Sequence, residues 1–216
     1  MPISMKIDFV SDVACPWCAV GLGALEAALV KVGDEIQAEL IFQPFELNPD
    51  MPPEGEDTQE HLAKKYGSTP EQSASIRKTI TARGAEVGFT FNLESRTRIY
   101  NTFDAHRLLH WAHLEGRQSL LKKALLKAYF TDGKNPSDPA VLLAAAQSAG
   151  LSSVQAQEIL EGDHYSAEVR ERERFYQSQG INSVPAVIIN DRHLISGGQP
   201  TEVFERALRQ IAKPAA

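Results

Sequence analysis

The chain holds two cysteines, Cys15 and Cys18, with Pro16 and Trp17 between them. Thiol–disulfide exchange needs one thiolate that attacks a disulfide and a second thiol that resolves the mixed disulfide. A structural disulfide across so short a loop would gain little from loop closure, and it would be unusual in a reducing compartment. The pair therefore predicts redox catalysis, with Cys15 and Cys18 as the candidate catalytic residues.

The residues after Cys15 have the pattern of a helix. Proline is tolerated in a first helical turn, and apolar residues recur at three- and four-residue spacing until Gly33. Unpaired backbone N–H groups and the helix dipole favour a thiolate at a helix N-terminus. We expect Cys15 to be the accessible nucleophile and Cys18, one turn on, the covered resolving thiol. Pro16 would stiffen the turn, and Trp17 would shape a docking surface.

A pair with this spacing is also half of a zinc site, which needs four ligands. No second cysteine pair exists, and the possible complement is His106, His110 and His113, which share one face of a predicted helix. Histidines on a helix face are usually just solvated. The sequence therefore predicts no metal.

Val184 and Pro185 stand directly before a β-rich run. Proline cannot donate to a sheet ladder and is common at a strand start, usually with a trans peptide bond. The functional alternative is a cis-proline whose preceding residue, Val184, offers free backbone groups to an extended substrate. Both interpretations stay open on this segment alone.

Two glycine-containing segments are weaker candidates. Gly21 and Gly23 lie within the first helix without the third glycine of a nucleotide loop, so they predict close helix packing. Residues 196–200 precede a helix, where backbone N–H groups could bind a carboxylate. Most such loops are only helix caps.

The remaining pattern predicts an α/β fold with a large helical insertion. The expected elements are a strand at 6–10, a helix at 17–32, a strand at 38–45, helices only from about 57 to 163, a helix at 164–179, strands at 186–189 and 193–196, and a helix opened by Pro200. Residues 1–48 and 164–216 then form one discontinuous domain, and residues 49–163 form the insertion. Within the insertion we expect capping boxes at 69–72 and 152–155 and a histidine-bearing helix at 99–115.

The composition of the 216-residue chain argues against some classes of partner. Its net charge of −6 argues against nucleic acid or an anionic membrane as the main partner. We see no apolar run near the length of about 18 residues that a membrane span needs. Nothing in the first residues resembles an export signal. We expect a cytoplasmic protein.

The sequence resembles the DsbA-like thioredoxin superfamily, and most closely its FrnE-like cytoplasmic branch of dithiol–disulfide oxidoreductases and isomerases. The segments that carry the resemblance span nearly the whole chain: 12–18, 44–49, 101–102, 105–107, 183–185 and 195–200. The resemblance implies a thioredoxin-like fold with an inserted helical domain, a redox-active Cys15–Cys18 pair and a cis bond before Pro185. It also implies that the Val184–Pro185 loop faces the cysteines and binds substrate.

Three functions follow as hypotheses. The first is a disulfide oxidoreductase or isomerase acting on protein or peptide disulfides, with no cofactor required and glutathione as a possible redox co-substrate. The second is a glutathione-dependent enzyme like the related 2-hydroxychromene-2-carboxylate isomerases and kappa-class transferases, which usually have serine where Cys15 stands. The third is a metal-binding or chaperone-like module without turnover.

Overall fold

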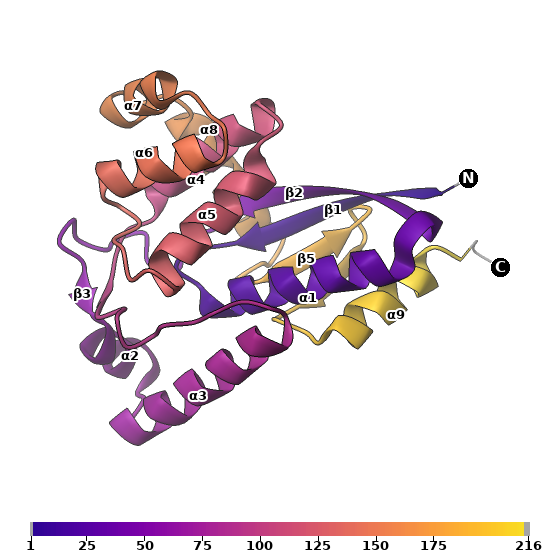
Figure 1. Cartoon of the computed structure of the whole chain (residues 1–216), viewed down its shortest axis with the longest axis horizontal. Helices are drawn as coiled ribbons and strands as arrows, with labels where there is room; N and C mark the ends of the chain where they lie inside the picture. The colour runs from indigo at the N-terminus through magenta and orange to yellow at the C-terminus, as the bar shows by residue number, and fades with distance from the viewer. Residues whose placement is uncertain (1, 214–216) are drawn as a thin grey trace.

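Strand β1 (Ile3–Ser11) organises the main sheet. In the computed structural model, which describes residues 2–213, β1 pairs in parallel with β2 (Ile36–Pro44) and antiparallel with β5 (Ala186–Ile189). Strand β6 (His193–Ser196) pairs antiparallel with β5, which gives the order β2-β1-β5-β6. The two ends of the sequence thus build one sheet (Figure 1), as the α/β prediction required.

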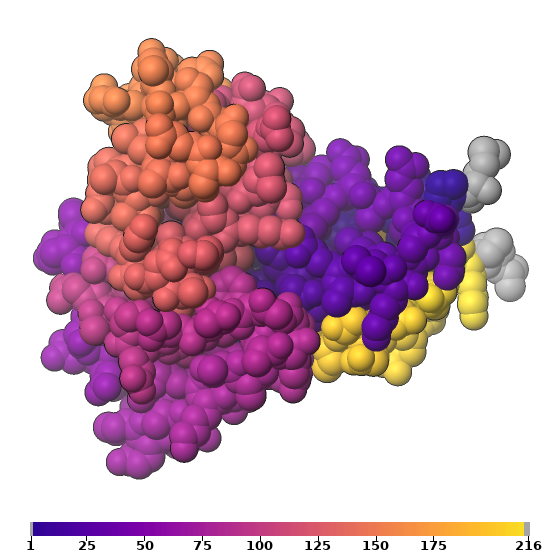
Figure 2. All heavy atoms as spheres, in the orientation of Figure 1, coloured from indigo at the N-terminus to yellow at the C-terminus, as the bar shows by residue number. Residues whose placement is uncertain are grey.

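Side chains of β1 alternate between the two faces of this sheet, as a pleated strand requires. Phe9 lies in the core beneath α1 (Pro16–Val32) and α9 (Thr201–Ile211). The next residue, Val10, packs in a separate cluster with Tyr176. Helices α1 and α9 lie side by side, so the first and last parts of the chain are in contact (Figures 1 and 2).

The expectation about apolar runs is wrong for one segment. Residues 16–35 are long and apolar enough to cross a membrane by length and composition. This segment contains α1, which packs against α9, α3 and the sheet, and half of it is buried inside the protein. The apolar residues of this segment are therefore explained by the position of α1 as the central helix of the core.

Between β2 and β5 the chain forms most of its helices. They are α2 (Thr58–Tyr66), α3 (Pro70–Glu86), α4 (Phe103–Leu114), α5 (Gln118–Phe130), α6 (Pro139–Ser148), α7 (Ser153–Glu161) and α8 (Ser166–Ser178). Helices α4 to α7 share one apolar cluster, and the end of α5 joins the cluster of α1. The fold is thioredoxin-like with a helical insertion.

The insertion also holds a small sheet that the sequence pattern did not predict. Strand β3 (Glu56–Asp57) pairs antiparallel with β4 (Arg98–Ile99). Because β4 uses residues at the start of the predicted 99–115 helix, α4 begins only at Phe103. Asn101 promotes that later start, since its side-chain oxygen accepts the Phe103 N–H at 2.8 Å.

The predicted capping boxes have different outcomes. At α3 both halves form: Thr69 accepts the Gln72 N–H, and the Gln72 side chain accepts the Thr69 N–H. At α7 only Ser152 accepts from the Gln155 backbone. One side-chain bond is enough to place a helix start, so both predicted starts are confirmed.

Strand β2 is an edge strand, and one side chain covers part of its free edge. The Gln118 amide accepts the Phe42 N–H and donates to the Phe42 carbonyl, both at 2.9 Å. A third bond runs from the same amide to the Leu109 carbonyl at 3.2 Å. This satisfies backbone groups that an edge strand would otherwise leave unpaired, and it fixes α4 and α5 beside β2.

Candidate active site

Cys15 occupies the residue before the first turn of α1, with extended backbone angles and no side-chain capping bond. The helices α2, α3, α6 and α7 instead begin with an Asp, Thr or Ser whose oxygen accepts a backbone N–H. At α1 the residue in the same position is Cys15, whose side chain makes no such bond. A thiolate there would face the unpaired N–H groups and the positive end of the helix.

Cys18 lies one turn deeper and is fully buried. Its backbone N–H donates to the Cys15 carbonyl at 3.1 Å, which starts the helix. Burial raises the pKa of the Cys18 thiol well above its usual value, and the neighbouring Cys15 adds to the shift. The two thiols are not bonded to each other. Cys18 is therefore held as a protonated thiol in this dithiol form.

The expected exposure of Cys15 needs a correction. Its side chain is only 4% exposed, so both thiols are covered, although Cys18 is covered more completely. Pro16 and Trp17, the two residues between them, are half-buried. The predicted order of exposure is right, but Cys15 is nearly as well covered as Cys18.

The Val184–Pro185 loop does lie against the cysteines. The peptide bond is cis, and the Cys15 thiol donates to the Val184 carbonyl at 3.6 Å. The Pro185 carbonyl accepts the Gly197 N–H at 2.8 Å. The Val184–Pro185 segment, far from Cys15 in sequence, therefore lies at its sulfur, and the loop after β6 is hydrogen-bonded to that segment.

The glycines of α1 and of the late loop allow this close approach. A Cβ atom on Gly21 would lie 3.1 Å from Cγ of Pro185, and one on Gly198 would lie 2.9 Å from the Trp17 carbonyl oxygen. A Cβ on Gly23 would lie 2.7 Å from a methyl of Val87. The interpretation of Gly21 and Gly23 as packing residues is confirmed.

Asp12 lies in the segment 12–18 that carries the family resemblance, but no role was predicted for it from the sequence. It is buried, and its two carboxylate oxygens accept the Ala14 N–H at 3.1 Å and the Leu47 N–H at 2.8 Å. His106 Nε2 lies 3.5 Å from the same carboxylate. Burial by itself raises the pKa of Asp12, but His106 and the two backbone N–H groups outweigh it and lower the pKa overall. Asp12 thus links the cysteine loop to the segment after β2 and lies beside α4.

Lys122 is a second residue that the sequence reasoning missed. It lies on α5, its side chain is fully buried, and its Nζ has no hydrogen-bond partner among residues 2–213. Burial lowers the pKa of Lys122, opposed by the nearby charges of Cys18, Asp12 and Cys15. The insertion therefore brings a buried basic group close to both thiols.

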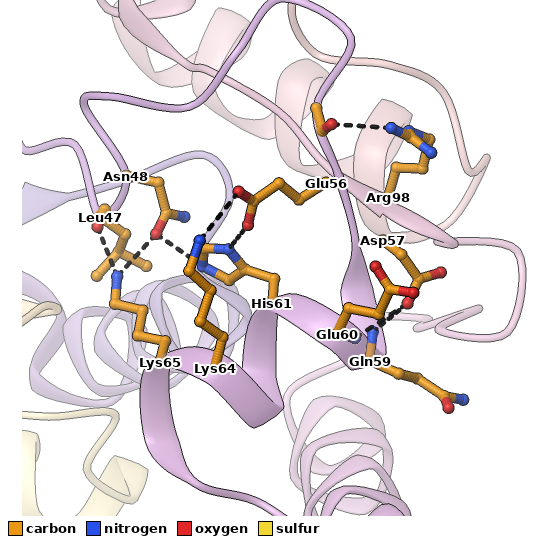
Figure 3. Close-up of polar contacts among 11 residues, drawn as sticks. Leu47, Asn48, Glu56, Asp57, Gln59, Glu60, His61, Lys64, Lys65 and Arg98 are labelled. Carbon is orange, nitrogen blue, oxygen red and sulfur yellow. Dashed lines mark hydrogen bonds and ion pairs between the residues drawn. The ribbon is translucent and has the colours of Figure 1, made fainter.

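Helix α2 fastens the loop after β2 (Figure 3). Lys65 Nζ donates to the Leu47 carbonyl at 2.6 Å and to Asn48 Oδ1 at 2.7 Å, and His61 bridges Asn48 and Glu56. Burial, and then the charge of Cys15, raise the pKa of Tyr66, the last residue of α2. This end of α2 therefore lies near the thiols.

The three histidines of α4 do not converge on one point. His106 is buried and faces Asp12, contrary to the expectation of a solvated face, while the His110 ring stacks on Tyr165 with ring centroids 5.2 Å apart. Within residues 2–213, no group of three or more His, Cys, Asp or Glu side chains is placed to hold a metal ion.

A family model described as a DSBA-like thioredoxin domain matches residues 6–209, which is nearly all of the sequence. The chain belongs to the DsbA-like thioredoxin family. The resemblance of the separate motifs is thereby confirmed, and so is the general class of activity, thiol–disulfide oxidoreduction.

Individual relatives agree with the family. The chain is 27% identical over 212 residues to YwbO, an uncharacterized protein of Bacillus subtilis (strain 168), covering 98% of this chain and 99% of YwbO. A probable DsbA oxidoreductase from Streptomyces coelicolor is 32% identical with a TM-score of 0.90, covering 98% and 93%. The cytosolic disulfide reductase DsbM from Pseudomonas aeruginosa, solved with GSH, shares the fold at 17% identity and a TM-score of 0.65, covering 95% and 98%.

Proposed function

We propose that this DsbA-like protein exchanges disulfides with protein or peptide substrates, with Cys15 as the nucleophile and Cys18 as the resolving thiol. The observation that carries the assignment is the position of Cys15 at the uncapped start of α1, in contact with the Val184 carbonyl. Cys18 is deeper, and burial keeps its pKa high. A thiol at a helix start is the better nucleophile of such a pair.

The proposed reaction has two exchange steps. The Cys15 thiolate attacks one sulfur of the substrate disulfide, and the other substrate sulfur leaves as a thiolate that takes up a proton. Cys18 then loses its proton and attacks the Cys15 sulfur, which releases the second substrate thiol. The substrate gains two electrons and the chain keeps a Cys15–Cys18 disulfide. The reverse sequence oxidises a dithiol, and internal attack within the mixed disulfide isomerises it.

The Val184–Pro185 loop is the proposed binding edge for the substrate backbone. The Val184 carbonyl lies 3.6 Å from the Cys15 sulfur, so a substrate N–H bonded to it would lie beside the nucleophile. Extended peptides commonly bind through main-chain hydrogen bonds of this kind. Pro16 and Trp17 are half-buried and would form the neighbouring wall.

We further propose that a small thiol such as glutathione recycles the pair. The product of substrate reduction is a Cys15–Cys18 disulfide, and a second thiol must reduce it before the next turnover. Glutathione in a reducing cytoplasm has that chemistry. DsbM, which shares the fold, was solved with GSH.

Trapping of a disulfide-bonded model peptide tests the cysteine roles. Cys18→Ser should accumulate a mixed disulfide with the peptide, detected by intact mass, because the resolving thiol is absent. Cys15→Ser is the matched control and should trap none. Equal trapping by both variants, or trapping by Cys15→Ser alone, would reverse the assignment. Peptide turnover by the unaltered protein, run with and without glutathione, separates exchange on peptides from a strictly glutathione-dependent enzyme.

A further inference from the structure

A pocket of about 280 Å³ opens between the edge strand β2 and helices α4, α5 and α8. Neither cysteine nor the Val184–Pro185 loop lines it, but Lys122 and His106 do, so the pocket lies behind the candidate active site. Its walls come from α4 and α5 of the insertion, from α8 and from β2 of the main sheet. The chemistry of its floor, mouth and walls indicates what it binds.

The floor of the pocket carries a basic group with unused hydrogen-bonding capacity. Lys122 is fully buried there and its ammonium nitrogen has no hydrogen-bond partner among residues 2–213. Gln118 also lines the pocket, but β2 and α4 already use its amide. Burying an unpaired basic group is costly unless a partner reaches it. The pocket is the space through which a partner can reach Lys122.

The mouth of the pocket is basic as well. Arg172 is half-buried, His110 is half-buried and His113 is exposed, and all three line the opening. Among residues 2–213, Arg172 holds only one hydrogen bond, a long one of 3.3 Å from its Nε to the side-chain oxygen of Gln43. None of the lining residues is an aspartate or glutamate. The charges of Cys18, Asp12 and Cys15 reach Lys122 from the candidate active site, but the lining itself is basic, and a concave lining of that charge attracts an anion.

The walls between floor and mouth are apolar. Phe42 and Leu109 are buried wall residues, and Ile41 and Pro44 complete this surface. The volume is many times the share of about 30 Å³ that one water takes in the liquid. A small inorganic anion would leave most of this space and the apolar surface unfilled. The fitting ligand has a charged end and an apolar body.

We propose that this pocket binds a small organic carboxylate, with its carboxylate on Lys122 and its apolar body against Phe42 and Leu109. The carboxylate supplies the acceptors that the ammonium group lacks, in a dry setting where such bonds are strong. Burial lowers the pKa of Lys122 in the free protein, although the charges of Cys18, Asp12 and Cys15 oppose that shift. A bound carboxylate opposes that shift, so binding is expected to weaken as the pH rises.

Isothermal titration with three carboxylates of increasing size tests the site: acetate, benzoate and 1-naphthoate. Benzamide is the neutral control of the same shape as benzoate, and inorganic phosphate is the control for a purely electrostatic site. The variant Lys122→Met keeps the length of the side chain without its charge. Lys123→Met is the matched control, because Lys123 is exposed and pairs with Glu26 on the surface.

Benzoate or 1-naphthoate should bind the unaltered protein and Lys123→Met alike, and affinity should fall by about tenfold or more in Lys122→Met. Benzamide and phosphate should bind much more weakly. The proposal is overturned if none of the three carboxylates binds saturably at millimolar concentration. It is also overturned if Lys122→Met binds like the unaltered protein, or if phosphate binds as tightly as benzoate.

Discussion

Asp12→Asn should destabilise the protein although the two side chains have the same shape. The carboxylate accepts two buried backbone N–H groups, one on each oxygen, from Ala14 and Leu47. An asparagine offers one accepting oxygen and one donating NH2 group. In either orientation the NH2 group faces a backbone N–H, and that N–H loses its acceptor.

The size of the effect follows from these contacts. A hydrogen bond to a charged group contributes about 1.5–3 kcal/mol, and an unsatisfied buried donor costs a comparable amount. The carboxylate charge 3.5 Å from His106 Nε2 is lost as well. We expect the free energy of unfolding to fall by about 2–4 kcal/mol. In a chain of this length that corresponds to a drop in Tm of about 4–16 °C.

Urea unfolding in reductant, followed by circular dichroism, measures the change. Asp132→Asn is the matched control: its partner Lys127 is an exposed lysine, and such pairs contribute at most about 1 kcal/mol. Because the folded pKa of Asp12 is lowered, its contribution is present above the unfolded pKa and is lost as the pH falls through the folded value. The gap between the unaltered protein and Asp12→Asn should therefore shrink below about pH 4. A loss under 1 kcal/mol at neutral pH, or a gap that widens in acid, would refute the reasoning.

Two further substitutions test the packing and the buried lysine. Gly198→Ala should lower the free energy of unfolding by about 1–3 kcal/mol, because the new Cβ would lie 2.9 Å from the Trp17 carbonyl oxygen. Added to Cys18→Ser, it should also slow the capture of peptide. A double variant that captures peptide at the rate of Cys18→Ser alone would contradict this. Lys122→Met should leave the free energy of unfolding unchanged or raise it by about 1–4 kcal/mol, since it removes an unpaired buried basic group. The folded pKa of Lys122 is lowered, so burying its charge destabilises the unaltered protein most at a pH below that value. The difference in free energy of unfolding between Lys122→Met and the unaltered protein should therefore narrow as the pH rises toward about 10. Urea unfolding at several pH values checks this, and a gap that grows with pH would show that Lys122 is not the cause.

The sequence predicted the parts of this fold that depend on local patterns. The strand before Cys15, the helix after it and the late hairpin all have clear periodicity, and the capping residues Thr69 and Ser152 mark real helix starts. The small sheet of β3 and β4 was missed because two-residue strands have no readable alternation. Their pairing depends on how the chain folds back over the intervening helices.

The buried polar residues were missed for a different reason. Asp12 accepts a backbone N–H that lies 35 residues along the chain and lies 3.5 Å from a histidine on α4, and no local pattern records such contacts. Lys122 did leave a signal, since it sits among Leu121, Leu125 and Leu126 on the apolar side of α5. A lysine at that position is usually interpreted as a side chain that reaches solvent, and here it does not.

The same contacts indicate that the insertion contributes to the candidate active site. The main sheet and α1 place Cys15 and Cys18, but the groups that surround Asp12 and Cys18 come from elsewhere: His106 from α4 and Lys122 from α5. Removing these helices would expose Asp12 and a thiol whose high pKa depends on burial. An exposed Cys18 would ionise more readily and compete with Cys15 for substrate. The order of attack proposed for the two cysteines therefore depends on helices outside the thioredoxin-like sheet.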